Sequence, residues 1–376
     1  MSVSPMPIGG AVALAQALPT ASKVTRDDGR APRPVGPGPT GRPFSQTVPL
    51  VSVCVPMRDE LGHIEACLDA FAAQTHPADR LQVIVVDGGS QDGSRALVDE
   101  RAAVTPWLEV VDNPLRKAAA AFNCGLRAAR GEVFCLFSAH GVPDPEYVAR
   151  SVAVLAETGA TGVGGRYDHR GEDPTSNAIG RAMVSPVGMA SPHRYAAERT
   201  VVDTISHPAY RLEDLEGVAF DESLERNSDY DFNWRLRSEG KVLVFDPSVA
   251  SVYRPRPSLT ALGRQFWWYG RWKERVVRRH PGSLRPRHLV APAFVASLGL
   301  GALASVTPAG RRALGVELAA YAAVVLAGTA AARPRRHGAD PATLAASFGV
   351  MHACWGAGFL ASFLEDACTS REARHG

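Results

Sequence analysis

The sequence lacks several features that would point to common classes of binding protein. Aromatic residues make up only 7% of the 376 residues, and the formal net charge is +3. A nucleic-acid partner usually requires a concentrated basic surface and stacking aromatics, so neither number favours one. The first apolar run is not followed by Gly-x-Gly-x-x-Gly, which removes the main support for a dinucleotide-dependent dehydrogenase.

Cysteine is also scarce, and its spacing suggests no metal or disulfide framework. The chain has no Cys-x-x-Cys pair and no cysteine–histidine spacing typical of zinc. We therefore expect small buried thiols in a reducing compartment. The six cysteines are Cys54, Cys67, Cys124, Cys135, Cys354 and Cys368.

Residues 1–47 are rich in Pro, Gly, Ala and Thr and show no sustained apolar period. No basic residue precedes the mildly apolar stretch 8–18, so a secretory signal is not expected. The composition predicts a disordered tail.

Residues 48–288 alternate short apolar runs with helical patterns, and we expect them to form one domain. Continuous apolar runs separated by helices predict a mostly parallel sheet covered on both faces, an α/β, Rossmann-like fold. The expected strands are 51–56, 81–86, 107–111, 132–137 and 241–245, with helices near 95–101, 117–130 and 229–238. Ligands bind such sheets beyond the carboxyl ends of the strands.

Residues 289–366 change character and read as membrane-associated helices. The apolar segments 289–306, 314–332 and 342–364 each approach the roughly 20 residues that cross a bilayer, and their Gly and Ala content suits close helix packing. We expect two or three spans. Glu317 and His352 interrupt two segments, which leaves a small soluble helical bundle as the alternative.

Basic residues flank these segments unevenly. Many arginines lie between residues 264 and 287, and more lie at 333–336. The positive-inside rule then places the preceding domain in the cytoplasm, at the cell membrane, although Arg311 and Arg312 would lie outside.

Three strand ends carry polar residues that suit a nucleotide. They are Pro56-Met-Arg-Asp-Glu60, Asp87-Gly-Gly-Ser-Gln-Asp-Gly-Ser94 and Ser138-Ala-His-Gly141. A carboxylate at a strand end can accept from a nucleobase or ribose, and a glycine-rich turn lets backbone N–H groups approach a ligand. An ordinary acidic turn remains the alternative for the second.

Taken in order, these motifs resemble the family 2 glycosyltransferases, which have the GT-A fold. The resemblance covers roughly residues 50–290 and extends through Ala219-Phe-Asp-Glu-Ser-Leu-Glu-Arg-Asn-Ser-Asp-Tyr-Asp-Phe-Asn-Trp-Arg235. It is strongest to the bacterial succinoglycan and exopolysaccharide branch, in which a hydrophobic tail is usual.

The resemblance implies a nucleotide diphosphate-sugar donor, usually linked to UDP. Asp87 matches the carboxylate that reads the nucleobase, and Lys117 lies where a basic residue helps to hold the donor. The other positions that the resemblance assigns to donor binding are Pro56, Arg58, Glu60, Ser90, Ser138, Gln265, Arg271 and Trp272.

The same resemblance implies an inverting reaction with Asp229 as the general base. An ionised carboxylate must lie within hydrogen-bond reach of the acceptor hydroxyl, and a helix N-terminus favours the anion. Asp229 could cap that helix at the same time, and Asp231 is the rival base.

Gln265, Arg271 and Trp272 resemble the Gln-x-x-Arg-Trp element of processive relatives, although they are spaced more widely. A guanidinium suits a departing diphosphate. The aromatic residues 266–269 could stack on sugars or form an interfacial belt before the membrane.

Two motif acids are missing. Where relatives carry Asp-x-Asp or Asp-Ala-His, this chain has Ser138-Ala139-His140, and Ser228 replaces the glutamate of Glu-Asp. His140 is the expected ligand of a divalent metal, Mn²⁺ or Mg²⁺, and imidazole suits Mn²⁺ better. Asp144 could substitute, or could simply cap a helix.

Two hypotheses follow. The first is an active hexosyltransferase that builds cell-surface polysaccharide on a saccharide or lipid-linked acceptor. The second is a catalytically weak homologue that binds nucleotide-sugar or glycan as a partner in a membrane biosynthetic complex; Ser138 and Ser228 favour it.

Overall fold

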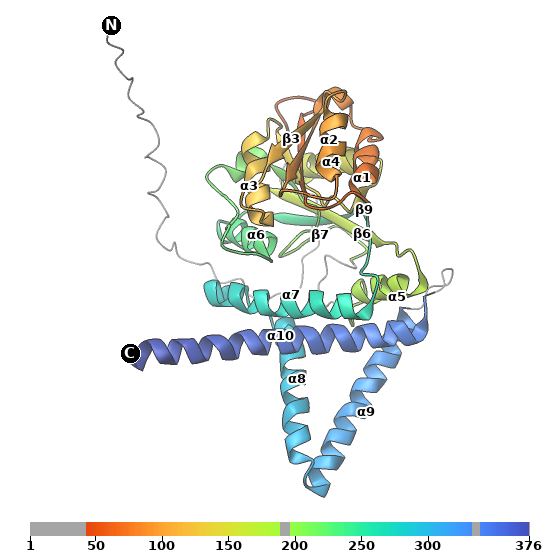
Figure 1. Cartoon of the computed structure of the whole chain (residues 1–376), viewed down its shortest axis with the longest axis vertical. Helices are drawn as coiled ribbons and strands as arrows, with labels where there is room; N and C mark the ends of the chain where they lie inside the picture. Colours follow the sequence, from red (N-terminus) through yellow and green to blue (C-terminus); the bar gives the residue numbers. More distant parts are fainter. Residues whose placement is uncertain (1–42, 189–195, 333–338, 376) are drawn as a thin grey trace.

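The computed structural model describes residues 43–188, 196–332 and 339–375. Residues 1–42, most of the tail predicted to be disordered, lie outside the described residues. The described chain forms an α/β domain that rests on a layer of two long helices, from which a helical hairpin projects away from the domain (Figure 1).

The domain is built on one mixed sheet. Its described strands run in the order β3-β2-β1-β4-β8-β6-β9-β5, with β7 paired to β9. The first four strands are mutually parallel, whereas β8 runs antiparallel to both of its neighbours. The strands are β1 (Val51–Met57), β2 (Leu81–Asp87), β3 (Leu108–Asp112), β4 (Val133–Leu136), β5 (Val142–Pro143), β6 (Gly162–His169), β7 (Thr200–Val201), β8 (Ala209–Arg211) and β9 (Leu243–Tyr253).

Helices cover both faces of the sheet, which explains why the central strands β1, β2 and β4 are buried at nearly every position and mostly apolar. Successive side chains of a strand point to opposite faces. Val53 and Val55 therefore enter one core, while Cys54 enters the other. The helices are α1 (Ile64–Ala72), α2 (Ser94–Ala102), α3 (Ala118–Ala128), α4 (Tyr147–Thr158), α5 (Pro174–Met183), α6 (Ser228–Ser238), α7 (Leu259–Arg279), α8 (Arg287–Ala304), α9 (Pro308–Ala331) and α10 (Pro341–His375), with short 3₁₀ turns η1 (Ala78–Arg80), η3 (Leu212–Leu215) and η4 (Pro281–Ser283).

The mostly parallel α/β sheet expected from the sequence is confirmed, and the fifth expected strand is longer than predicted. Instead of ending near residue 245, β9 continues to Tyr253 because it pairs with β6 again from Ala250 onward. A register shift between Gly165 and Arg166 makes this possible. A Cβ at Gly165 would lie 1.6 Å from the Val249 carbonyl oxygen, so only glycine allows this approach.

Below the domain, α7 and α10 lie side by side, and α8 and α9 form the projecting hairpin (Figure 1). Glycines bring the two long helices together. A Cβ at Gly270 would lie 2.1 Å from the Trp355 carbonyl oxygen, and one at Gly358 would lie 2.2 Å from that of Trp267. The α7–α10 pair therefore forms one packed layer under the domain.

Three described helices are long and apolar enough to cross a membrane: Arg287–Ala304, Pro308–Ala331 and Pro341–Glu365. They differ in how much protein covers them. Only 6% and 11% of the most apolar windows of α8 and α9 are buried, against 39% for α10. Few residues of the hairpin are therefore buried, whereas α10 buries a larger share of its residues against the helices it contacts.

Candidate functional site

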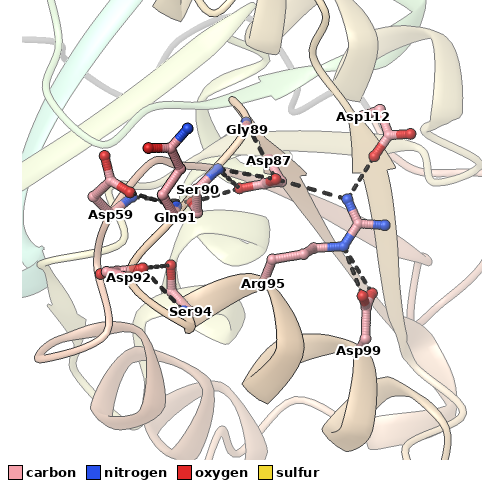
Figure 2. A network of polar contacts seen from close by, with 10 residues as sticks. All are labelled: Asp59, Asp87, Gly89, Ser90, Gln91, Asp92, Ser94, Arg95, Asp99 and Asp112. Atoms are coloured by element: carbon pink, nitrogen blue, oxygen red, sulfur yellow. Dashed lines mark hydrogen bonds and ion pairs between the residues drawn. The ribbon is translucent and has the colours of Figure 1, made fainter.

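The turn after β2 is organised by the carboxylate of Asp87, which is only 5% exposed. It accepts hydrogen bonds from the Ser90 hydroxyl at 2.6 Å and from the backbone N–H groups of Gly89 and Ser90 at 3.2 Å (Figure 2). Nη1 of Arg95 lies 3.7 Å from the carboxylate, and Arg95 also pairs with Asp99 and Asp112. Asp87 therefore fixes the glycine-rich turn in place, with its charge balanced by a guanidinium.

The turn after β1 is joined to the turn after β2. Asp59, in a left-handed conformation with φ of 56°, accepts a hydrogen bond from the Gln91 N–H at 2.7 Å and donates its own N–H to the Ser90 hydroxyl at 3.0 Å (Figure 2). The neighbouring Arg58 is half-exposed and packs over Gly88. Pro56 precedes this turn inside β1, opposite Val86. The structure thus brings together the first two predicted strand ends.

The third strand end joins them through His140. Its Nδ1 lies 3.2 Å from a carboxylate oxygen of Glu60, so the predicted metal ligand contacts the residue that follows the end of β1. Both side chains are partly exposed, at 35% and 21%, so a ligand can reach them. These two residues, 80 positions apart in sequence, offer one imidazole and one carboxylate to a metal ion. Within the described residues, no three His, Cys, Asp or Glu side chains group closely enough to hold a metal ion by themselves.

Ser138 has a partner that the sequence did not indicate. Its hydroxyl lies 3.1 Å from Nε2 of His207, whose Nδ1 lies 2.9 Å from the Ser251 hydroxyl. The ring of His207 stacks on that of Phe137, with centroids 4.0 Å apart. The backbone of His207 has a φ of 40°, an unusual conformation that often marks functional sites. Where the resemblance leads us to expect a motif acid, Ser138, His207 and Ser251 therefore form a chain of polar contacts. His207 lies in the irregular region 166–228, where no sequence pattern singled it out.

Lys117 lies at the start of α3, directly before its first residue. Its Nζ donates to the backbone carbonyl of Glu222 at 3.1 Å, so the lysine ties α3 to the loop that precedes α6. Asn123 strengthens the same link by donating to Glu222 Oε1 at 2.8 Å and to the Phe220 carbonyl at 2.9 Å. The loop that leads into α6, the helix of the candidate base, is thus anchored to α3.

The two aspartates at the start of α6 have different surroundings. Asp231 is 1% exposed and lies 2.8 Å from Nε2 of His280 and 2.9 Å from Nε of Arg235. Burial raises the pKa of Asp231, but hydrogen bonds and charge from His280 and Arg235 outweigh it, and the pKa lies below its ordinary value. This carboxylate is a buried structural anion.

Asp229, by contrast, is exposed in the first turn of α6. Asn227, which precedes the helix, has φ of 57° and turns the chain into it. Besides burial, the charge of Asp229 raises the pKa of Tyr210 on β8, the strand next to β4. Of the two candidates, Asp229 is the one that an acceptor can reach from solvent.

The three α7 residues predicted to bind the donor take part in helix packing. Gln265 is 5% exposed and donates to the Tyr269 hydroxyl at 2.7 Å. Trp272 is 6% exposed, with the guanidinium of Arg275 over its ring at 4.5 Å. Arg271 forms a two-point ion pair with Glu365 of α10. The structure thus places Arg271 at the joint between the two long helices.

Comparison with known proteins gives consistent matches. Residues 52–215 match the family described as glycosyl transferase family 2. The succinoglycan biosynthesis protein ExoA of Rhizobium meliloti is 29% identical over 83% of this chain and 94% of its own length. A dolichyl N-acetyl-α-D-glucosaminyl phosphate 3-β-D-2,3-diacetamido-2,3-dideoxy-β-D-glucuronosyltransferase of Methanococcus voltae is 25% identical over 61% of this chain and 74% of its own.

Among solved structures, a mannosyltransferase of Pyrobaculum calidifontis, in complex with GDP-Man and Mn²⁺, superimposes with a TM-score of 0.52. The two are 23% identical, and the match covers 89% of each chain. The expected GT-A fold with apolar C-terminal helices is therefore confirmed.

Proposed function

We propose that this chain is a family 2 glycosyltransferase that moves a sugar from a nucleotide diphosphate donor, UDP-linked, to a saccharide or lipid-linked acceptor during cell-surface polysaccharide synthesis. The observation that carries the proposal is the different exposure of the two aspartates at the start of α6. Asp229 is exposed at the helix start, while Asp231 is buried against His280 and Arg235. An exposed carboxylate at a helix N-terminus stays ionised and accessible, as a general base must be.

In the proposed reaction Asp229 takes the proton of an acceptor hydroxyl. The hydroxyl oxygen then attacks the anomeric carbon while the bond from that carbon to the diphosphate breaks. One displacement inverts the anomeric configuration and releases the nucleoside diphosphate. The linked turns after β1 and β2 would hold the nucleoside, with Asp87 ordering the turn and Arg58 and Lys117 adding positive charge at its edge.

The donor diphosphate requires positive charge at the end of β4, and we assign this to a divalent cation on His140 and Glu60. Their 3.2 Å contact offers one imidazole and one carboxylate, and the diphosphate oxygens supply further donors. Imidazole favours Mn²⁺ over Mg²⁺. When bound, the cation neutralises charge on the departing diphosphate.

The pairing of Arg271 with Glu365 supports a role for this arginine in holding α7 to α10.

We place the catalytic domain on the cytoplasmic face of a membrane that α8 and α9 cross as a hairpin. The exposure of their apolar windows supports two spans, and the packing of α10 along α7 supports a position at the surface for that helix. Basic residues concentrate on α7 and around the start of α8, at the domain side of the hairpin, consistent with the positive-inside rule. The site then faces acceptors carried by the membrane.

The test is release of nucleoside diphosphate by detergent-purified protein from a panel of nucleotide-sugars, with Mn²⁺, Mg²⁺ or EDTA, and with lipid extract as the source of acceptor. We expect turnover with a UDP-sugar that EDTA abolishes and that Mn²⁺ restores better than Mg²⁺. His140→Ala should lower the affinity for Mn²⁺.

The second candidate, a nucleotide-sugar or glycan-binding partner with little turnover, is favoured by the Ser138–His207 hydrogen bond at the position of a motif acid. Binding of UDP without release from any donor, in the presence of lipid extract, would support that function and contradict the transferase.

A further inference from the structure

A buried histidine links two serines just beyond the end of β4. β8 begins opposite the end of β4 and runs antiparallel to it, so His207, which precedes β8, lies past the strand end next to Ser138. Nε2 of His207 lies 3.1 Å from Ser138 Oγ, and Nδ1 lies 2.9 Å from the Oγ of Ser251 on β9. His207 is 8% exposed and Ser251 is 3% exposed, whereas Ser138 is only partly buried. The three residues therefore run from the protein interior to the edge of the candidate site.

The ring of His207 is packed on several sides. Phe137 stacks on it, and the edge of the Tyr167 ring meets it with centroids 4.7 Å apart. The Tyr147 hydroxyl donates to the backbone carbonyl of His207 at 2.8 Å. A Cβ at Gly141 would lie 3.0 Å from the ring carbon Cε1, so the residue at this position must be small. This packing keeps the two ring nitrogens directed at the two serines.

Burial decides the direction of both hydrogen bonds. A neutral imidazole has one N–H donor and one acceptor nitrogen. Within the described residues, Nδ1 of His207 is the one hydrogen-bond partner of the Ser251 hydroxyl, so the serine proton is paired only if Nδ1 accepts it. The other tautomer would leave a buried hydroxyl proton unpaired, which is costly. Nδ1 therefore accepts from Ser251, and the Nε2–H donates to Ser138.

The Ser138 hydroxyl is left with a proton to donate away from the histidine. The Nε2–H occupies one lone pair of its oxygen, and in the part of the chain that the structure describes no other group accepts its proton. An ionised carboxylate at this position would be an acceptor without a proton, whereas the held hydroxyl is a donor. Hydrogen bonds from a hydroxyl to an ionised oxygen are short and strong, so the matching ligand is an anion.

We propose that Ser138 donates a hydrogen bond to a diphosphate oxygen of the nucleotide donor, and that His207 and Ser251 are the positioning residues that set this direction. The proposal rests on the transferase function above and adds two residues to its donor site. Ser138 lies two residues before His140, at the strand end where the diphosphate requires positive charge. The replacement of the motif acid by serine thus changes an acceptor into a donor. None of the three residues takes part in the displacement.

The first test is calorimetric titration of the full chain in detergent with UDP and uridine, and with GDP and guanosine as the alternative pair, in Mn²⁺ and in EDTA. Ser138→Ala should weaken binding of the diphosphate by at least about tenfold, the effect of losing one hydrogen bond to a charged group, and leave nucleoside binding unchanged. Ser138→Asp should weaken the diphosphate in EDTA, because a carboxylate repels it, and recover in Mn²⁺. Ser347→Ala, which removes a buried hydroxyl from α10, is the control and should bind like the wild-type chain.

The second test concerns the positioning residues. His207→Asn suits the left-handed backbone but is too short to reach Ser138. It should lower affinity for the diphosphate by about threefold, since an unheld hydroxyl samples three staggered orientations. Nitrogen-15 NMR of histidine-labelled protein reports the tautomer directly, with the His207 signals identified by their absence from the His207→Asn spectrum. We expect the proton on Nε2 and none on Nδ1, which a merely structural histidine would not require.

Unchanged diphosphate binding by Ser138→Ala, or a proton on Nδ1 of His207, would overturn the proposal. Equal losses for the diphosphate and its nucleoside would overturn the diphosphate assignment. A wild-type chain that binds neither UDP nor GDP would overturn both this proposal and the transferase. Asp229→Asn separates the two, because it should stop transfer and leave Ser138-dependent binding unchanged. Such binding without turnover in the wild-type chain would therefore contradict only the transferase.

Discussion

The two aspartates of α6 provide a sharp test of the site, because replacing Asp231 by asparagine should lower stability, whereas replacing Asp229 should lower the rate of transfer. Asp231→Asn removes a buried charge from His280 and Arg235, which lie 2.8 and 2.9 Å away. Breaking a fully buried pair costs about 3–5 kcal/mol, and the partial exposure of both partners lowers our expectation to about 2–3 kcal/mol. For a domain of this size that is a fall of roughly 4–12 °C in Tm.

Asp229→Asn changes an exposed residue, so its stability should stay within about 0.5 kcal/mol of the wild-type chain. Its rate of nucleoside diphosphate release should instead fall by about 10²–10⁴-fold, the usual contribution of a general base. The Asp231 variant, compared well below its own Tm, should retain most of the wild-type rate. Circular dichroism during heating measures the change in stability. The rate of nucleoside diphosphate release, assayed for each variant about 20 °C below its own Tm, measures the change in activity.

The pH dependence of stability adds an independent check. Because the pKa of Asp231 is lowered in the folded state, its stabilising contribution is present above the ordinary aspartate pKa and is lost as the pH falls towards the folded value. The Asp231→Asn chain should therefore lose less stability than the wild-type chain on acidification through this range. The reasoning is refuted if Asp231→Asn abolishes turnover without loss of stability while Asp229→Asn remains active.

Three further predictions concern packing and attachment. Gly125→Ala should destabilise the domain by about 1–3 kcal/mol in chemical denaturation, because the new Cβ would lie 2.3 Å from the Cys54 sulfur. Gly62→Ala is the control and should leave the stability unchanged, because a Cβ there meets no atom within 4 Å. Equal effects of the two substitutions would contradict the packing argument. Glu365→Gln should leave the denaturation midpoint close to that of the wild-type chain, because exposed ion pairs contribute little and Glu365 is exposed in its pair with Arg271. A clear loss of stability would mean that this pair holds the two helices together. Replacing the α8–α9 hairpin by a short Gly-Ser linker should let alkaline carbonate release the chain from membranes, and retention would show that α10 anchors it alone.

The sequence determined the first parallel strands and the edge of the sheet where the candidate site lies, whereas β6 and β8 were not predicted. Apolar runs such as 81–86 alternate with helices, and the polar residues at the end of each parallel strand must meet at one edge because all these strands share a direction. Asp87 and Glu60 were therefore identifiable without coordinates. So was the opposition of Asp229 and Asp231, since residues two apart on a helix point to nearly opposite sides.

Only the tertiary structure decided which of the candidate site residues are exposed and which residues they contact. His207 reaches Ser138 across 69 positions, and Arg271 meets Glu365 across 94. No local period encodes such contacts, because they depend on how separate elements dock. The difference in burial between the two aspartates depends on docking as well, because His280, which follows α7, contacts Asp231, whereas Asp229 is exposed.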